Sequence, residues 1–187
     1  QLLAQSSIGV EAFTRKSLED AISIALDVAA INGSGSSNQP TGILNTSGIG
    51  SVAGGTNGLI PTWGNIVALE TAAETANALM GNLNYLSTPG VKGALKTALK
   101  ASGVSGYIWS EDNTLNGYRA IASNNVPSTL TKGSASGICH AVIFGNWNEL
   151  IIGQWAGVDI TVDPYTKAEQ ALVRMVVNTY WDIALRH

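Results

Sequence analysis

Cys139 and its neighbour His140 are the residues best equipped for covalent chemistry, because a thiolate beside a histidine base is a common nucleophile. Adjacent residues of a strand point to opposite faces, so we do not expect these two to act as a pair. The second histidine, His187, ends the sequence. Residues 133–137 read GSASG and place alanine where the G-x-S-x-G nucleophile elbow needs serine. We predict no catalytic residue, and a hydrolase that uses Cys139 is a remote alternative.

Ligand-binding motifs are missing as well. No G-x-x-x-x-G-K-[ST] or G-x-G-x-x-G phosphate loop occurs among the 21 glycines, and one cysteine excludes a cysteine-rich metal site. Three pairs of carboxylates could work together: Glu70 with Glu74, Glu111 with Asp112, and Asp159 with Asp163. None has a histidine nearby in the sequence, so we interpret them as solvated surface charges. We therefore predict no metal site and no cofactor.

Two further residue types could bind a partner. Lys92, Lys96 and Lys100 share the spacing of one helix face, which is typical of a solvated surface and less often of an anion-binding stripe. Tryptophans can stack on sugars or bases, as in a carbohydrate-binding adhesin, but here each lies in an apolar stretch. We predict packing in the core or between subunits for Trp63, Trp109, Trp147, Trp155 and Trp181.

Composition narrows the class of protein. The chain has 187 residues, of which 45% are hydrophobic and 12% charged, so it can form a sizeable core and is not disordered. A net charge of -3 lacks the basic surface expected for direct binding to nucleic acid. No apolar run approaches the ~20 residues of a membrane helix, and no signal peptide is recognisable. We therefore expect a protein made in the cytoplasm, and the absence of an initial methionine suggests a fragment or processed product.

Periodicity predicts helices in the first half of the chain. Apolar residues recur at helical spacing over 6–31, where Asn32 and Gly33 end the helix. A glycine-rich stretch follows, which we interpret as a slack loop: it holds Gly33, Gly35, Gly42, Gly48, Gly50, Gly54, Gly55 and Gly58. A second helix is predicted over 63–80, closed by Gly81. A short strand over 84–87 then leads to a third helix through Ala101, with Thr88 as N-cap and Pro89 in its first turn.

Strands are predicted in the second half. Short ones are expected over 107–110, 118–123 and 140–144, and a hairpin over 151–155 and 158–163 that turns near 156–157. From residue 171 apolar side chains occupy odd positions over about 15 residues, which indicates a very long half-buried strand with a bend or bulge partway. A helical turn at 167–170 is compatible with the sequence. Together these patterns predict an α/β middle, with a mixed sheet flanked by the second and third helices, between a long helix and very long strands.

Several runs resemble the major capsid proteins of tailed double-stranded-DNA bacteriophages, which share the Hong Kong 97-like fold. Those before residue 128 are ALDVA (25–29), NGSG (32–35), PTGIL (40–44), TW (62–63), YLSTP (85–89), GALK (93–96), GY (117–118) and NVP (125–127). The closing runs are more specific: FGNW (144–147), IGQW (152–155), VDI (158–160), VDPY (162–165) and DIALRH (182–187). The resemblance covers essentially the whole chain. Ser34 and Asn146 stand where many relatives carry aspartate.

The resemblance implies a Hong Kong 97-like α+β subunit with an axial α/β domain and a peripheral domain that has a long spine helix and long antiparallel strands. Residues 1–36 would be the spine helix, 37–146 the axial domain and 147–187 the peripheral strands, with the glycine-rich stretch as the hinge. The chain resembles the C-terminal two-thirds of such a subunit, without the N-terminal arm and extended loop. Some members of the family form crosslinks between subunits. The resemblance does not predict such crosslinks for this chain, because the loop that supplies the lysine is missing.

The function implied by the resemblance is self-assembly. The subunit would form pentamers and hexamers of an icosahedral head that encloses double-stranded DNA without reading its sequence, with a scaffold or maturation protease and a portal as further partners and no membrane. It would be made in the bacterial cytoplasm and end in the virion. The alternative within the same fold is an encapsulin-like bacterial nanocompartment.

Overall fold

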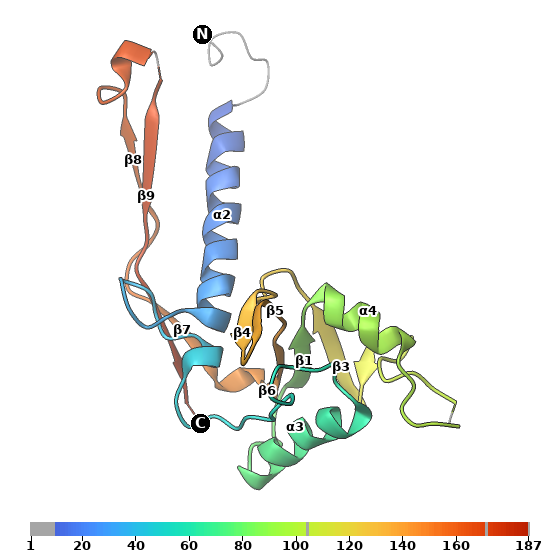
Figure 1. Ribbon diagram of the computed structural model, residues 1–187. Helices are drawn as coiled ribbons and strands as arrows, with labels where there is room; N and C mark the ends of the chain where they lie inside the picture. The colour runs from blue at the N-terminus through green and yellow to red at the C-terminus, as the bar shows by residue number, and fades with distance from the viewer. Residues whose placement is uncertain (1–9, 104, 171, 187) are drawn as a thin grey trace.

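The computed structural model describes residues 10–103, 105–170 and 172–186. The helices are α2 (Val10–Asn32), α3 (Trp63–Thr75) and α4 (Pro89–Thr97), with short 3₁₀ turns η1 (Ile43–Asn45), η2 (Trp147–Glu149) and η3 (Ala168–Gln170). The strands are β1 (Leu83–Ser87), β2 (Thr114–Leu115), β3 (Tyr118–Ala122), β4 (Leu130–Lys132), β5 (Ala135–Cys139), β6 (Val142–Asn146), β7 (Leu150–Gln154), β8 (Asp159–Asp163), β9 (Arg174–Asn178) and β10 (Trp181–Leu185). Figure 1 shows an α/β body, with α2 and the β8–β9 ribbon projecting from it in the same general direction.

The body is built on a mixed sheet of order β2-β3-β1-β6, in which β1 runs parallel to β3 and antiparallel to β6. Tyr85 on the central strand β1 is fully buried, and its hydroxyl donates to the carbonyl of Ile66 on α3 at 3.1 Å. Around these two residues lies a first core cluster, completed by Val91, Leu95, Ile108, Trp109, Leu115 and Ala120. The cluster holds α3 and α4 on the sheet, as the predicted α/β middle of the chain requires.

Both helices of the body begin where the sequence predicts but end earlier. Thr62 and Asn65 form a capping box at the start of α3, yet α3 ends at Thr75 and not at Met80, because Asn77 takes a left-handed conformation with φ 57°. Thr88 caps α4 as predicted, with Pro89 in the first turn.

The predicted end of α4 at Ala101 is also wrong, and the cause is a neighbouring segment. The carbonyls of Leu95 and Ala98 accept hydrogen bonds from Trp109 and Ile108. Residues 107–109 thus bind backbone carbonyls that a longer α4 would use for its own hydrogen bonds. They form isolated bridges to Leu99 and Leu115 and not the predicted strand over 107–110.

The long opening helix is confirmed within the described residues, whereas the first part of the prediction, residues 6–9, lies outside them. The glycine-rich stretch after it is tighter than predicted. Gly42 N–H donates to the Gly33 carbonyl at 2.9 Å, and Ser34 bridges to Thr41. A Cβ atom on Gly42 would lie 2.4 Å from the Gly33 nitrogen, so the backbone approaches itself too closely for a side chain. The first part of this stretch is therefore a packed turn.

A second core cluster lies where α2, the sheet and the last strands meet. Its buried members are Ile31, Ile43, Val126, Ala141 and Ile143. Trp147, Leu150 and Leu185 pack against it from the segments at the start of β7 and the end of β10. This cluster fixes the C-terminal end of α2 and these two strand ends against the body.

The predicted hairpin that turns at residues 156–157 is wrong. The β7 strand pairs with β10 and β8 pairs with β9, so residues 150–163 run outward as one arm and residues 174–185 return as the other. We call these two arms, together with the tip between them, the long ribbon. The return arm breaks at Thr179 and Tyr180, which confirms the predicted bend, and η3 is the helical turn at the tip. Period-two patterning cannot identify a pairing partner, which explains the error.

The predicted strand over 140–144 is shifted. Cys139 ends β5, which pairs with β4 as a hairpin that the sequence analysis missed, and β6 begins at Val142. The strand over 118–123 is confirmed as β3, and that over 84–87 as β1.

Candidate functional site

The most prominent feature of the surface is the apolar character of the two projections. On the long ribbon, Tyr165 is 85% exposed, Trp155 71% and Tyr180 63%, and Ile151, Ile152, Val158, Val162, Leu172 and Val173 are also exposed. On α2, Phe13, Ile24 and Val28 are exposed. Large exposed apolar patches on a folded protein usually mark sites of association. The geometry therefore points to contacts with other chains.

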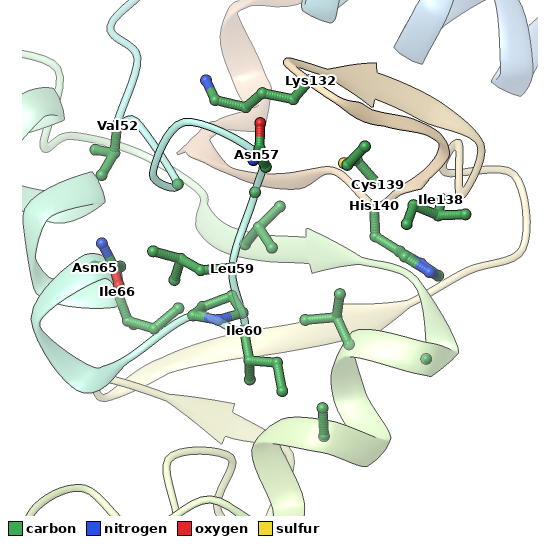
Figure 2. Close-up of a pocket in the computed structure, with 18 of the residues that line it drawn as sticks. Val52, Asn57, Leu59, Ile60, Asn65, Ile66, Lys132, Ile138, Cys139 and His140 are labelled. Carbon is green, nitrogen blue, oxygen red and sulfur yellow. The ribbon is translucent and has the colours of Figure 1, made fainter.

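Cys139 and His140 both line a cavity of about 550 Å³ between α3, α4, the β4–β5 hairpin and the loop 52–61. Figure 2 shows this loop crossing the cavity, with the Cys139 sulfur near the Asn57 side and the His140 ring extending toward α4. A Cβ atom on Gly58 would lie 3.2 Å from Cys139 Sγ, whereas one on Gly90 would lie 3.1 Å from His140 Cε1. No hydrogen bond joins the two side chains in the described part of the chain, and Cys139 is half-buried.

His140 supports the first turn of α4. Its Nδ1 atom lies 2.7 Å from Thr88 Oγ1, and Thr88 Oγ1 accepts from Val91 N–H at 3.3 Å. Thr88 itself is buried. The imidazole thus has a structural partner on a helix cap, and this contact between residues far apart in the chain had no signal in the sequence.

Glu70 is not the solvated charge that was predicted. It is half-buried, and its carboxylate accepts hydrogen bonds from Tyr118 Oη at 2.7 Å and from Asn116 Nδ2. The hydrogen bond to Glu70 raises the pKa of Tyr118, and burial raises the pKa of Tyr85 to about 12. The Asn116-Gly117 turn brings Asn116 to this site, since both residues have positive φ. The cluster joins α3 to the β2–β3 hairpin.

Two other residues of the predicted carboxylate pairs, Asp163 and Asp112, stabilise turns. The Asp163 carboxylate accepts hydrogen bonds from the Thr166 hydroxyl and from the backbone N–H groups of Thr166 and Tyr165, which together lower its pKa. Asp112 accepts from Thr114 at the turn before β2. Within residues 10–103, 105–170 and 172–186, no three His, Cys, Asp or Glu side chains gather as metal ligands, and no helix is long and apolar enough to span a membrane.

Two lysines of the body lie over the rings of tryptophans. Lys92 Nζ lies 5.4 Å from the ring centroid of Trp109, and Lys100 Nζ lies 4.5 Å from that of Trp63. Lys100 lies beyond the end of α4, so the predicted single stripe is wrong. Cation–π contacts of this kind add stability to the body.

Three of the five tryptophans pack as predicted. Trp109 belongs to the first core cluster, Trp63 packs against it and Trp147 packs against the second. Trp155 is exposed on the long ribbon, where packing between subunits stays a prediction, and Trp181 is partly buried on β10.

Known proteins resemble this chain in sequence and in architecture. The model of the family described as Phage capsid family matches residues 1–187. A major capsid protein of Halomonas phage phiHAP-1 is 32% identical over 168 residues, which are 90% of this chain and 25% of that protein. The chain thus spans about a quarter of the length of that relative.

Solved structures show the same fold. A chain of the capsid of an empty GTA particle computed with C5 symmetry has a TM-score of 0.72 at 20% identity, over 99% of this chain and 65% of that one. The capsid of the native GTA particle gives 0.69 at 18% identity, over 98% and 64%. This chain therefore belongs to the phage capsid family and has the Hong Kong 97-like capsid fold, an α+β architecture.

Proposed function

We propose that this chain is part of a subunit that assembles into the pentamers and hexamers of an icosahedral phage or prophage head around double-stranded DNA. The observation that carries the proposal is the exposed apolar surface of α2 and the long ribbon, in a member of the phage capsid family. These side chains are only partly covered by the described residues. Other copies of the subunit would cover them.

Simple energetics support assembly through many such contacts. Burying one large apolar side chain contributes about 1.5–3 kcal/mol, so a few side chains per contact give only a weak association. In a closed symmetric shell each contact is repeated many times, and the sum stabilises the particle while each step stays reversible. The exposed apolar side chains of α2 and the long ribbon suit this role.

We propose the domain division that the resemblance implies: residues 37–146 as the axial domain, with the spine helix 1–36 and the strands 147–187 as the peripheral domain. The first core cluster lies within the proposed axial domain. The second joins Ile31 of the spine helix and Leu150 of β7 to residues of that domain. The hinge would then be a firmly packed joint that sets a fixed angle.

The role proposed is structural, without catalytic residues, metal or cofactor. DNA would be enclosed without sequence-specific contacts, which agrees with a net charge of -3. A scaffold or maturation protease and a portal would be further partners. The subunit would be made in the host cytoplasm and reside in the virion.

Electron microscopy of the full-length subunit, expressed with its scaffold or protease, tests the proposal. We expect closed shells, with DNA inside particles from infected or induced cells. Particles filled with a protein cargo would indicate a nanocompartment instead, and failure to form any shell would overturn the proposal.

A pair of substitutions at Trp155 tests the observation behind it. Trp155→Ala should reduce the yield of particles at least tenfold, because the exposed ring loses its partner surface. Trp155→Phe keeps much of the apolar area and should assemble. Equal yields for the two variants would show that this part of the ribbon is not a contact.

A further inference from the structure

Among the residues that the structure describes, β7 has one free edge and little cover on either face. Ile151 and Ile152 point to opposite faces and are 48% and 43% exposed. Within residues 10–103, 105–170 and 172–186 the strand pairs with β10 on one side only. Sheets commonly protect free edges with charged residues or proline, but residues 150–158 contain neither. This edge is therefore open to another strand.

Two hydrogen bonds define which backbone groups face β10. Trp155 N–H donates to the Tyr180 carbonyl at 3.1 Å, and Arg186 N–H donates to the Glu149 carbonyl at 3.0 Å. In an antiparallel ladder, hydrogen-bonded pairs alternate with pairs that are not bonded. The odd-numbered residues of β7 therefore bond to β10, in keeping with the register of the pair.

The even-numbered residues face away from β10. Ile152 and Gln154 thus present their N–H and C=O groups to the free edge of β7. The outer edge of β10 differs, because the Asp182 carboxylate accepts the outward N–H of Ile183 at 2.9 Å. That carboxylate also places a negative charge beside the edge. Of the two edges of this pair, β7 is the one prepared for a new strand.

We propose that an extended segment of a neighbouring copy adds to the free edge of β7 as a third strand. The inference rests on the proposed function, since a shell surrounds each subunit with identical copies. A two-stranded ribbon is only marginally stable in water, and a third strand would complete it. Main-chain hydrogen bonds give such contacts their affinity, and alternate side chains give specificity. The uncharged edge fits an uncharged segment with apolar residues at alternate positions.

Hydrogen exchange of single amides in the full-length subunit tests the proposal without any substitution. In unassembled subunits the amides of Ile152 and Gln154 should exchange at least a hundredfold faster than those of Ile151 and Gly153. In particles all four should be protected. Fast exchange of Ile152 and Gln154 in intact particles would overturn the proposal. So would protection of both amides before assembly, because a segment of the same subunit would then cover the edge.

Two variants of one residue separate the backbone from the side chain. Ile152→Pro removes an outward N–H that β10 does not use, and edge strands tolerate proline at such positions. We expect its particle yield to fall at least tenfold, while Ile152→Val, which keeps both the N–H and most of the apolar side chain, stays within threefold of the wild type. Equal yields for both variants would contradict strand addition. If Ile152→Pro lowers the melting temperature of the unassembled subunit, the exchange measurement decides. Absence of wild-type particles would contradict the proposed function itself, not this contact.

Discussion

His140 Nδ1 lies 2.7 Å from Thr88 Oγ1, although 52 positions separate the two residues in the chain. The threonine hydroxyl already accepts Val91 N–H, so its proton is available for the imidazole nitrogen. The helix cap of α4 and the segment between β5 and β6 are thereby joined by one hydroxyl group. His140 therefore has a structural role, although it follows Cys139, the single cysteine of the sequence.

Replacing Thr88 by alanine should lower the free energy of unfolding by about 1–2 kcal/mol, since the cap of α4 and the contact to His140 are both lost. Thr88→Ser keeps the hydroxyl and is the matched control, with a smaller loss. Urea unfolding followed by circular dichroism measures both. Equal stability of the two variants would show that the hydroxyl is not important.

Two glycines should respond to alanine in opposite directions. A Cβ atom on Gly42 would lie 2.4 Å from the Gly33 nitrogen and 2.7 Å from the Ala29 carbonyl oxygen, so Gly42→Ala should destabilise the protein by about 3 kcal/mol or more. Gly93 lies on the exposed side of α4 with no atom within 4 Å of such a Cβ. Gly93→Ala should stabilise by about 0.5–1 kcal/mol. Calorimetric melting temperatures test both, and a stable Gly42→Ala variant would refute the packed turn.

Alkaline pH should destabilise the protein through Tyr85. Burial raises the pKa of Tyr85 from its usual 10 to about 12, so the folded state keeps the phenol proton more tightly than the unfolded chain does. This stability is fully present below pH 10 and is lost as the pH rises to 12, by about 2–3 kcal/mol in total. Urea unfolding between pH 8 and 12 measures the loss.

The control for this experiment is Tyr85→Phe, which should flatten part of the alkaline decline. Its hydrogen bond to the Ile66 carbonyl is also lost, so its stability at pH 8 should be about 1 kcal/mol lower. The hydrogen bond to Glu70 raises the pKa of Tyr118 as well, so some pH dependence should remain. A variant with the full wild-type decline would contradict the assignment to Tyr85.

Local signals in the sequence located the helices and their starts. Thr88 with Pro89 and Thr62 with Asn65 lie at helix N-termini because capping depends on residues within one turn. The Asn116-Gly117 pair is also a local signal, and it would have indicated the β2–β3 hairpin. Asn77 is a further local signal. It marks the end of α3, and the prediction that placed this end at Met80 did not take it into account.

Partners distant in sequence could not be inferred. The alternation in residues 150–163 shows which faces a strand has, but it does not show that β7 pairs with β10 and β8 with β9. The ion pair between Glu149 and Arg186 also joins residues that are far apart in the sequence. Glu70 likewise has the composition of a surface residue and became half-buried only because the β2–β3 turn lies beside it. The fold itself was predicted through a family resemblance, which carries the long-range information that single residues lack.

Trp147 should be less tolerant of replacement by phenylalanine than Trp109, although Trp109 is more deeply buried. Trp147 Nε1 donates to the Asn84 carbonyl at 3.1 Å, whereas Trp109 Nε1 is buried without a partner among the described residues. Removing a buried donor that has no partner offsets part of the cost of the smaller ring, by about 1–3 kcal/mol. Trp147→Phe has no such compensation and loses about 1 kcal/mol of hydrogen bonding in addition. Urea unfolding of the two variants tests this order, and a larger loss for Trp109→Phe would show that its indole nitrogen has a partner, such as a buried water molecule.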